Sequence, residues 1–167
     1  MSYLETGVVD VKEIKIPSEA RFMKGPVVII ECVQRIPCNP CVDSCPRGAI
    51  KINGSINNIP EVDFQLCNGC GVCISNCPGL AIFVIDKTYS EERATVSIPY
   101  EFLPLPEKGE RVDLLDRSGK VCGKGEIVRI RNAKIQDRTP VVTIAVDKDL
   151  VMQVRFFKRR IDERKTG

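Results

Sequence analysis

The chain has 167 residues, a formal net charge of +3, nine cysteines and no histidine, and 43% of its residues are hydrophobic. This length holds one ordinary domain or two small ones, and the composition is that of a soluble globular protein. The absence of histidine excludes imidazole-assisted nucleophiles, histidine-containing zinc sites, Rieske-type clusters and histidine-ligated haem, so thiolate metal chemistry is what remains.

The longest apolar stretches, residues 25–30 and 79–85, are much shorter than the roughly 18 residues that a membrane-spanning helix needs. The N-terminus, Met1 to Glu5, lacks the basic start and the apolar run of a secretion signal. We therefore expect no membrane span and a cytoplasmic location. Thiols stay reduced there, so nine cysteines favour metal ligation over disulfides.

In the first half of the chain, the apolar pattern predicts an arm and four short strands. Residues 8–16 alternate well enough for an edge strand. The β-branched runs 27–30 and 81–85 are expected to be strands that pair with each other. Two further short strands flank Asn53-Gly54 and predict a small hairpin. They are residues 49–52 and 59–62.

From Thr95 onward, the pattern changes to short strands separated by turns. The predicted strands are residues 95–100, 111–115, 126–131, 141–146 and 152–157. Their spacing, about 10 to 15 residues, fits a small antiparallel barrel or sandwich. Pro99, Pro104 and Pro106 predict a stiff linker or a covered barrel edge near the join.

The distribution of cysteines divides the chain. Eight of the nine lie between Cys32 and Cys77, and the remaining ninety residues contain only Cys122. We predict an N-terminal arm over residues 1–24, a cysteine domain over 25–90, and a small all-β domain with a basic tail over 91–167. An offset of 32 residues maps Cys38, Cys41, Cys45 and Pro46 onto Cys70, Cys73, Cys77 and Pro78. Such a repeat indicates a duplicated unit of strand, cysteine loop, short helix and strand.

The second cysteine group is a highly specific motif. It reads Cys67-x2-Cys70-x2-Cys73-x3-Cys77-Pro78. This run holds [4Fe-4S] clusters in bacterial ferredoxins, where the fourth cysteine ligates the other cluster. Gly69 and Gly71 permit positive φ and close backbone approach, so amide groups could point at the cluster sulfides.

The first group keeps the last three positions of this motif and departs at the first. Arg35 stands where the repeat expects a cysteine, and Cys32 lies three residues earlier. With crossed ligation, cluster II would be held by Cys45, Cys67, Cys70 and Cys73, and cluster I by Cys32, Cys38, Cys41 and Cys77. The longer loop can return the Cys32 thiolate to the cluster, whereas Cys122 would have to arrive from the other domain. Without Cys32, cluster I would be a [3Fe-4S] cluster or have an open iron.

Residues 27–85 closely resemble the two-cluster bacterial-type ferredoxins, through these cysteines and the repeated Cys-Pro-x-x-Ala-Ile. The resemblance implies one-electron transfer and a ferredoxin fold. We therefore expect an α+β chain, with a ferredoxin-like domain followed by a small antiparallel β-barrel or sandwich. The stretch 31–41, ECVQRIPCNPC, is also similar to the small iron-sulfur subunits that accompany flavin-dependent amino-acid or amine dehydrogenases.

A free ferredoxin does not need the extra residues of the second domain. We therefore expect a non-catalytic subunit of a hetero-oligomeric complex, which relays single electrons from a flavoprotein dehydrogenase to an acceptor. The first alternative is a free-standing ferredoxin with an accessory domain. A second is an iron-sulfur nucleic-acid-binding module. Two clusters, each with a net charge of about −2 including its thiolates, turn the formal +3 into about −1, so we expect no nucleic-acid partner.

Other interpretations have weaker support. A radical-generating activase needs Cys-x3-Cys-x2-Cys, and Gly48 and Leu80 stand where the third cysteine would be. A pair of structural zinc sites would separate its cysteines into pairs. Cys122 is either a free barrel thiol or a further ligand, and Arg35 is either a solvated charge or a cation beside a cluster. The tail, residues 152–167, carries six basic and two acidic residues and is expected to be a solvated strand end or a contact with another chain.

Overall fold

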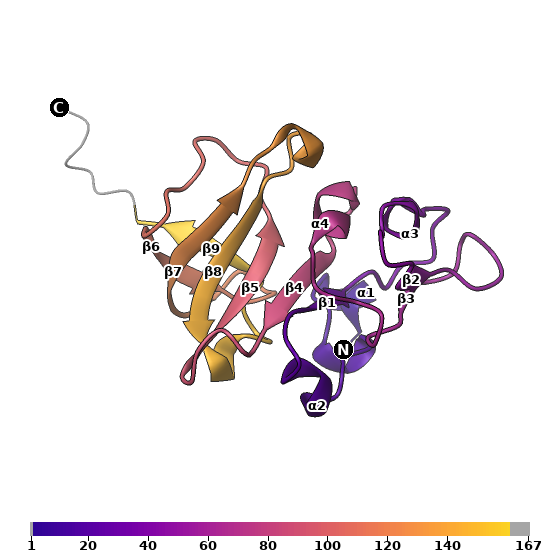
Figure 1. Ribbon diagram of the computed structural model, residues 1–167, viewed down its shortest axis with the longest axis horizontal. Helices are drawn as coiled ribbons and strands as arrows, with labels where there is room; N and C mark the ends of the chain where they lie inside the picture. The colour runs from indigo at the N-terminus through magenta and orange to yellow at the C-terminus, as the bar shows by residue number, and fades with distance from the viewer. Residues whose placement is uncertain (1, 161–167) are drawn as a thin grey trace.

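The computed structural model describes residues 2–160. Seven antiparallel strands form one sheet in the order β1-β4-β5-β8-β7-β6-β9, and β2 and β3 form a separate pair (Figure 1). The strands are β1 Val27–Ile30, β2 Ile50–Lys51, β3 Glu61–Val62, β4 Ile82–Asp86, β5 Arg93–Pro99, β6 Arg111–Leu115, β7 Val121–Arg131, β8 Val141–Asp147 and β9 Phe156–Arg159. The helices are α1 Tyr3–Thr6, α2 Glu19–Phe22, α3 Pro40–Asp43 and α4 Val72–Asn76, with 3-10 turns η1 Val11–Glu13, η2 Lys134–Gln136 and η3 Lys148–Leu150.

The cysteine segment has the predicted duplicated unit, which occurs as β1-α3-β2 and then as β3-α4-β4. β1 pairs with β4 from Val27 opposite Ile85 to Ile30 opposite Ile82, which confirms the predicted pairing. The predicted hairpin is also confirmed, since Ile50 pairs with Val62. In Figure 1, α4 lies between the large sheet and α3.

Both faces of β1 and β4 are covered, so these strands are continuous apolar runs rather than alternating ones. One face packs into the core of the large sheet through Val27, Ile29, Phe83 and Ile85. The other face packs against the cysteine loops through Val28, Ile30, Ile82 and Val84. The two strands therefore separate the sheet core from the cysteine-containing layer.

The sheet continues from β4 into β5 through pairs such as Val84 with Ser97, across position 90, where the sequence predicts a domain boundary. The predicted strands of the second half are present, joined in a single antiparallel sheet. This sheet curls enough for the ring of Tyr100, after β5, to stack on Phe157 of β9 at 5.2 Å. A barrel or sandwich arrangement of these strands stays a prediction.

The expected edge strand over residues 8–16 was wrong. The chain instead makes the 3-10 turn η1, because the Asp10 carboxylate accepts from the Lys12 amide at 2.9 Å and Glu13 accepts from the Asp10 amide at 2.9 Å. This reciprocal capping outweighs a weak alternation.

The starts of two strands in the second half also differ from the prediction. β9 begins at Phe156 rather than at residue 152, because a turn closed by the Val154 amide on the Leu150 carbonyl precedes it. β7 begins at Val121, five residues before the predicted start. Pro99 lies within the predicted strand 95–100 rather than in a linker, since it pairs with Val141 at the end of β5. Residues 161–167 of the predicted basic tail lie outside the described residues.

Among residues 2–160, no helix has the length and apolar character needed to cross a membrane.

Candidate metal centre

Two cavities are each lined by four cysteines. The first is lined by Cys32, Cys38, Cys41 and Cys77. The second is lined by Cys45, Cys67, Cys70 and Cys73. The structure thus brings together both predicted quartets, and in each quartet one cysteine comes from the other half of the repeat.

The short helices explain how each cysteine loop divides its thiols between the two cavities. α3 begins with proline after Asn39, and α4 begins after Gly71, whose φ of +74° is unfavourable for other residues. Each helix is a single turn that buries its own cysteine, Cys41 or Cys73. The chain then leaves the helix, and the following cysteine reaches the neighbouring cavity.

Backbone amides donate to cysteine sulfur at equivalent places in both halves. The Ala49 amide lies 3.3 Å from the Cys45 Sγ, and the Ala81 amide lies 3.5 Å from the Cys77 Sγ. The Gly69 amide also donates to the Cys67 Sγ, at 3.4 Å. Such N–H groups stabilise negative charge on sulfur, and they explain the repeated Cys-Pro-x-x-Ala spacing.

The most buried thiol of each quartet, Cys41 or Cys73, does not ionise readily on its own. Burial, followed by the nearby Cys67, Cys70 and Cys45, raises the pKa of Cys73 to about 12. Burial and the nearby Cys77 and Cys38 raise the pKa of Cys41 to about 11. A positively charged core beside Cys41 and Cys73 would offset this effect and favour their thiolates.

The donor sets fit iron-sulfur cubanes, because each consists of four cysteines, the ligand set of [4Fe-4S] clusters. Within residues 2–160, no three cysteine, aspartate, glutamate or histidine side chains lie close enough together to hold one metal ion. Gly69, with φ of +68°, leaves no room for a side chain, because a Cβ there would lie 2.5 Å from the Pro26 Cβ. This close approach fixes the loop that carries Cys67 and Cys70.

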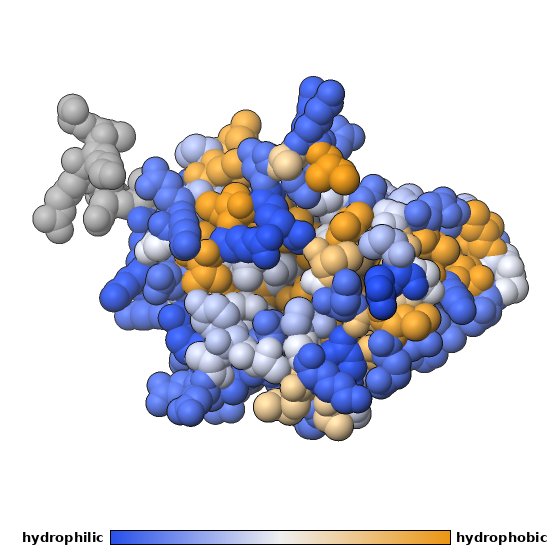
Figure 2. Space-filling model, in the orientation of Figure 1, coloured by the Kyte–Doolittle hydropathy of each residue, from blue (hydrophilic) through white to orange (hydrophobic). Residues whose placement is uncertain are grey.

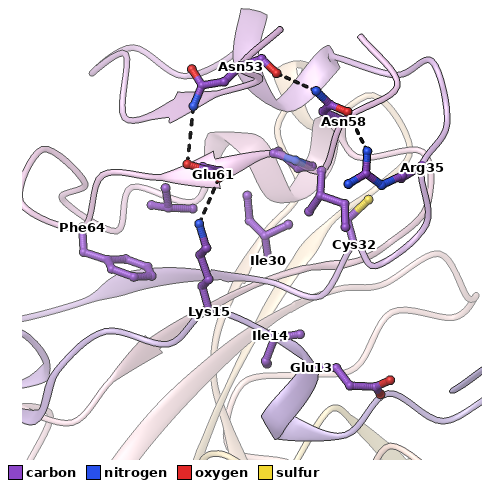
Figure 3. A pocket seen from close by; sticks show the side chains of 13 residues that line it. Glu13, Ile14, Lys15, Ile30, Cys32, Arg35, Asn53, Asn58, Glu61 and Phe64 are labelled. Atoms are coloured by element: carbon purple, nitrogen blue, oxygen red, sulfur yellow. Dashed lines mark hydrogen bonds and ion pairs between the residues drawn. The ribbon is translucent and has the colours of Figure 1, made fainter. Parts of the chain in front are cut away.

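Cys32 lies just after β1 and joins the first quartet. Burial, then the nearby Cys77, raises its pKa, with a further contribution from Cys38. It also lines an adjoining pocket of about 390 Å³ (Figure 3). There, exposed Arg35 donates to the Asn58 Oδ1 at 2.9 Å. Arg35 is therefore a solvated charge that lies on the rim of a pocket shared with Cys32.

Sequence reasoning missed two arginines that hold the loop of the second quartet. Arg21 is buried and donates to the Cys67 carbonyl at 2.6 Å and to three other carbonyls, those of Gly25, Pro26 and Phe64. Arg131, on β7, donates to the Cys70 carbonyl at 2.7 Å. Burial lowers the pKa of Arg131, but a guanidinium stays protonated at neutral pH. Neither residue belongs to a motif, so only the tertiary fold reveals them.

Cys122 lines neither cysteine cavity. It lies on β7 and packs against the core of the large sheet. Burial raises its pKa, and the nearby Asp116 adds to the effect. These surroundings are those of a partly buried thiol outside the candidate metal centre.

Comparisons with known proteins agree on the cysteine segment. The family model for a 4Fe-4S dicluster domain matches residues 32–81. A ferredoxin-type protein NapF from Haemophilus influenzae is 37% identical over 68 residues, 38% of this chain and 39% of that protein. The pyruvate synthase subunit PorD from Methanothermobacter marburgensis is 38% identical over 47 residues, 28% of this chain and 51% of that protein.

One subunit of an ion-translocating oxidoreductase complex from Methanosarcina acetivorans is 38% identical over 60 residues, 35% of this chain and 22% of that protein. The chain thus matches between about a fifth and a half of the length of these relatives. No solved structure gives a significant match. Residues 32–81 thus match a ferredoxin-type 4Fe-4S dicluster domain, and this match supports two [4Fe-4S] clusters in the cysteine segment.

Proposed function

We propose that each cysteine quartet holds one cluster. Cluster I is assigned to Cys32, Cys38, Cys41 and Cys77, and cluster II to Cys45, Cys67, Cys70 and Cys73. The shared lining of each cavity supports this assignment, as do the amide donors to Cys45, Cys67 and Cys77. A bound cluster supplies a one-electron redox centre, and the cysteines and amides fix its position and favour its charge.

We further propose that the chain is part of an oxidoreductase complex and relays electrons between a flavoprotein dehydrogenase and an acceptor in the cytoplasm. The observation that carries this proposal is the sheet that extends the cluster-binding unit. All the cysteines that line the two cavities lie within residues 25–90, and residues 91–167, proposed as a barrel-like or sandwich-like unit, would serve attachment. Two relatives have names that describe subunits of larger enzymes.

The surface supports an attached state. Phe102 and Leu103, in the loop after β5, are 62% and 87% exposed, and Figure 2 shows hydrophobic surface on both halves of the molecule. Large exposed apolar side chains that lie together are typical of contact surfaces. A free-standing ferredoxin with an accessory domain is the alternative, and it leaves this loop without a purpose.

Anaerobic purification of the tagged chain from its native cells tests the proposal. We expect a stoichiometric complex that contains bound flavin, seen in its absorbance spectrum, and a flavoprotein identified by mass spectrometry. Addition of that dehydrogenase's substrate should bleach the iron-sulfur absorbance of the complex. A chain that elutes alone with both clusters would contradict membership of a complex and favour the free ferredoxin.

A further inference from the structure

Arg131 brings a positive charge from the large sheet to the loop of one quartet only. Its Nη1 donates to the Cys70 carbonyl at 2.7 Å. Its Nη2 lies against Gly71, where any Cβ would collide with it. Arg131 is half-buried, and its charge interacts with Cys70 and Cys73. The glycine at position 71 thus opens the space through which this guanidinium approaches the second quartet.

The second quartet has other cations nearby, and they act in the same direction. Buried Arg21 donates to the Cys67 carbonyl at 2.6 Å. Arg47 lines the same cavity but is exposed, so water screens its charge. Two partly or fully buried guanidinium groups therefore bond to carbonyls of this quartet's own cysteines.

The first quartet has no equivalent among the described residues. Arg35 lies nearby but is exposed. Arg155 is buried and Arg117 is partly buried, yet both pair with the carboxylate of Glu31. Side chains alternate along an extended chain, so Glu31 continues the face of Val27 and Ile29 toward the sheet core, while Cys32 continues the opposite face. These two arginines are thus partly neutralised and on the other side of β1.

A nearby cation changes the two redox states unequally. A [4Fe-4S] centre with four thiolates carries a charge of about −2 when oxidised and about −3 when reduced. A guanidinium therefore stabilises the reduced state more, and it does so most where water is partly excluded. The cluster beside Arg131 should have the higher reduction potential.

We propose that Arg131 makes cluster II the electron-accepting member of the pair, so that an electron passes from cluster I to cluster II. This inference rests on the proposed assignment of the two quartets. One electron leaves reduced cluster I and enters oxidised cluster II, and no bond or proton changes. The large sheet thereby has a redox role, because β7 supplies the residue that sets the direction.

The test is an anaerobic redox titration of the full chain, followed by electron paramagnetic resonance (EPR), with wild type beside Arg131→Gln. We expect the equilibrium constant for electron transfer from cluster I to cluster II to fall about tenfold, which corresponds to about 59 mV for one electron. Repeating the titration in the Cys32→Ala background identifies the shifted signal, because cluster II should survive that change.

Arg129→Gln is the matched control, since Arg129 lies two residues away on β7 but is exposed. It should change the constant by less than about twofold. Arg131→Lys keeps the charge and should restore most of the wild-type value, which separates charge from loop packing. If Arg131→Gln loses iron, the titration is made instead on Arg131→Lys with full iron content. A cluster II potential in Arg131→Lys that is as low as the potential of cluster I would then overturn the proposal. An unchanged constant in iron-replete Arg131→Gln would also overturn it.

A wrong assignment of the quartets would appear separately. In that case, Cys32→Ala would alter the same signal that Arg131→Gln shifts. Two intact clusters with equal responses to Arg131→Gln and Arg129→Gln would leave the assignment in place and refute only the role of Arg131.

Discussion

Replacing Cys45 with alanine is expected to abolish the cluster associated with Cys67, Cys70 and Cys73, although Cys45 lies in the other cysteine motif. Cys45 lines the cavity of those three residues, and its nearness to Cys73 contributes to the raised pKa of that thiol. Iron should fall from about eight toward about four atoms per chain, with one EPR signal lost. Anaerobic iron and sulfide analysis, together with EPR of the reduced protein, measures both.

Cys77→Ala is the matched variant, because Cys77 occupies the equivalent position of the repeat and lines the other cavity. It should remove the signal that Cys45→Ala leaves intact. If Cys45→Ala instead affects the same cluster as Cys38→Ala, each motif serves its own cluster and the crossed arrangement is wrong.

Glu31→Ala is expected to destabilise the fold by about 3–5 kcal/mol, because it leaves two buried guanidinium groups without their carboxylate. The Glu31 Oε1 accepts from the Arg117 Nη2 and from the Arg155 Nε, each at 2.6 Å. The three side chains are between 5% and 11% exposed. The Nη2 of Arg155 is already without a hydrogen-bond partner within the described residues, and the substitution would also leave its Nε without the Glu31 carboxylate.

Anaerobic urea unfolding, followed by circular dichroism and cluster absorbance, measures the change in midpoint. Glu19→Ala is the control, because it breaks an ion pair with Lys87 in which Glu19 is 77% exposed, and it should cost less than about 1 kcal/mol. Equal effects of the two substitutions would show that the buried triad does not hold β1 to the loops before β7 and β9.

The same triad predicts a pH dependence. Burial alone would raise the pKa of Glu31, but the hydrogen bond from Arg117 and the charge of Arg155 outweigh it and lower the pKa below its ordinary value of 4.5. The contribution of Glu31 to stability is therefore complete above pH 4.5 and is lost as the pH falls through the lowered folded-state pKa. The difference in stability between wild type and Glu31→Gln should shrink over that acidic range.

The grouping of the cysteines around two cavities could be predicted from the sequence, because cysteine spacing specifies cluster geometry directly. Which cysteines ligate which cluster stays a prediction. The departure at Arg35 pointed to Cys32, and Cys32 lies in the cavity with Cys38 and Cys41. The β1–β4 and β2–β3 pairs were also predictable, since β-branched runs and the Asn53-Gly54 turn are strong local signals.

The residues that surround the site could not be predicted in this way. Arg131 and Cys70 are brought together only by the register of β7 in the large sheet, and that register depends on long-range pairing rather than local pattern. The edge strand predicted over residues 8–16 was wrong for a different reason. The capping hydrogen bonds at Asp10 stabilise so short a segment more than an edge strand without a partner would.

The most direct test of the central claim is EPR of the anaerobically reduced protein, with wild type beside Cys32→Ala. Two clusters of four cysteines each, with Cys32 a ligand of cluster I alone, predict two interacting [4Fe-4S]⁺ signals in wild type. In the variant, they predict an unchanged cluster II signal without that interaction, and a cluster I that is lost or has become [3Fe-4S]. Two interacting signals that persist unchanged in Cys32→Ala would contradict the assignment.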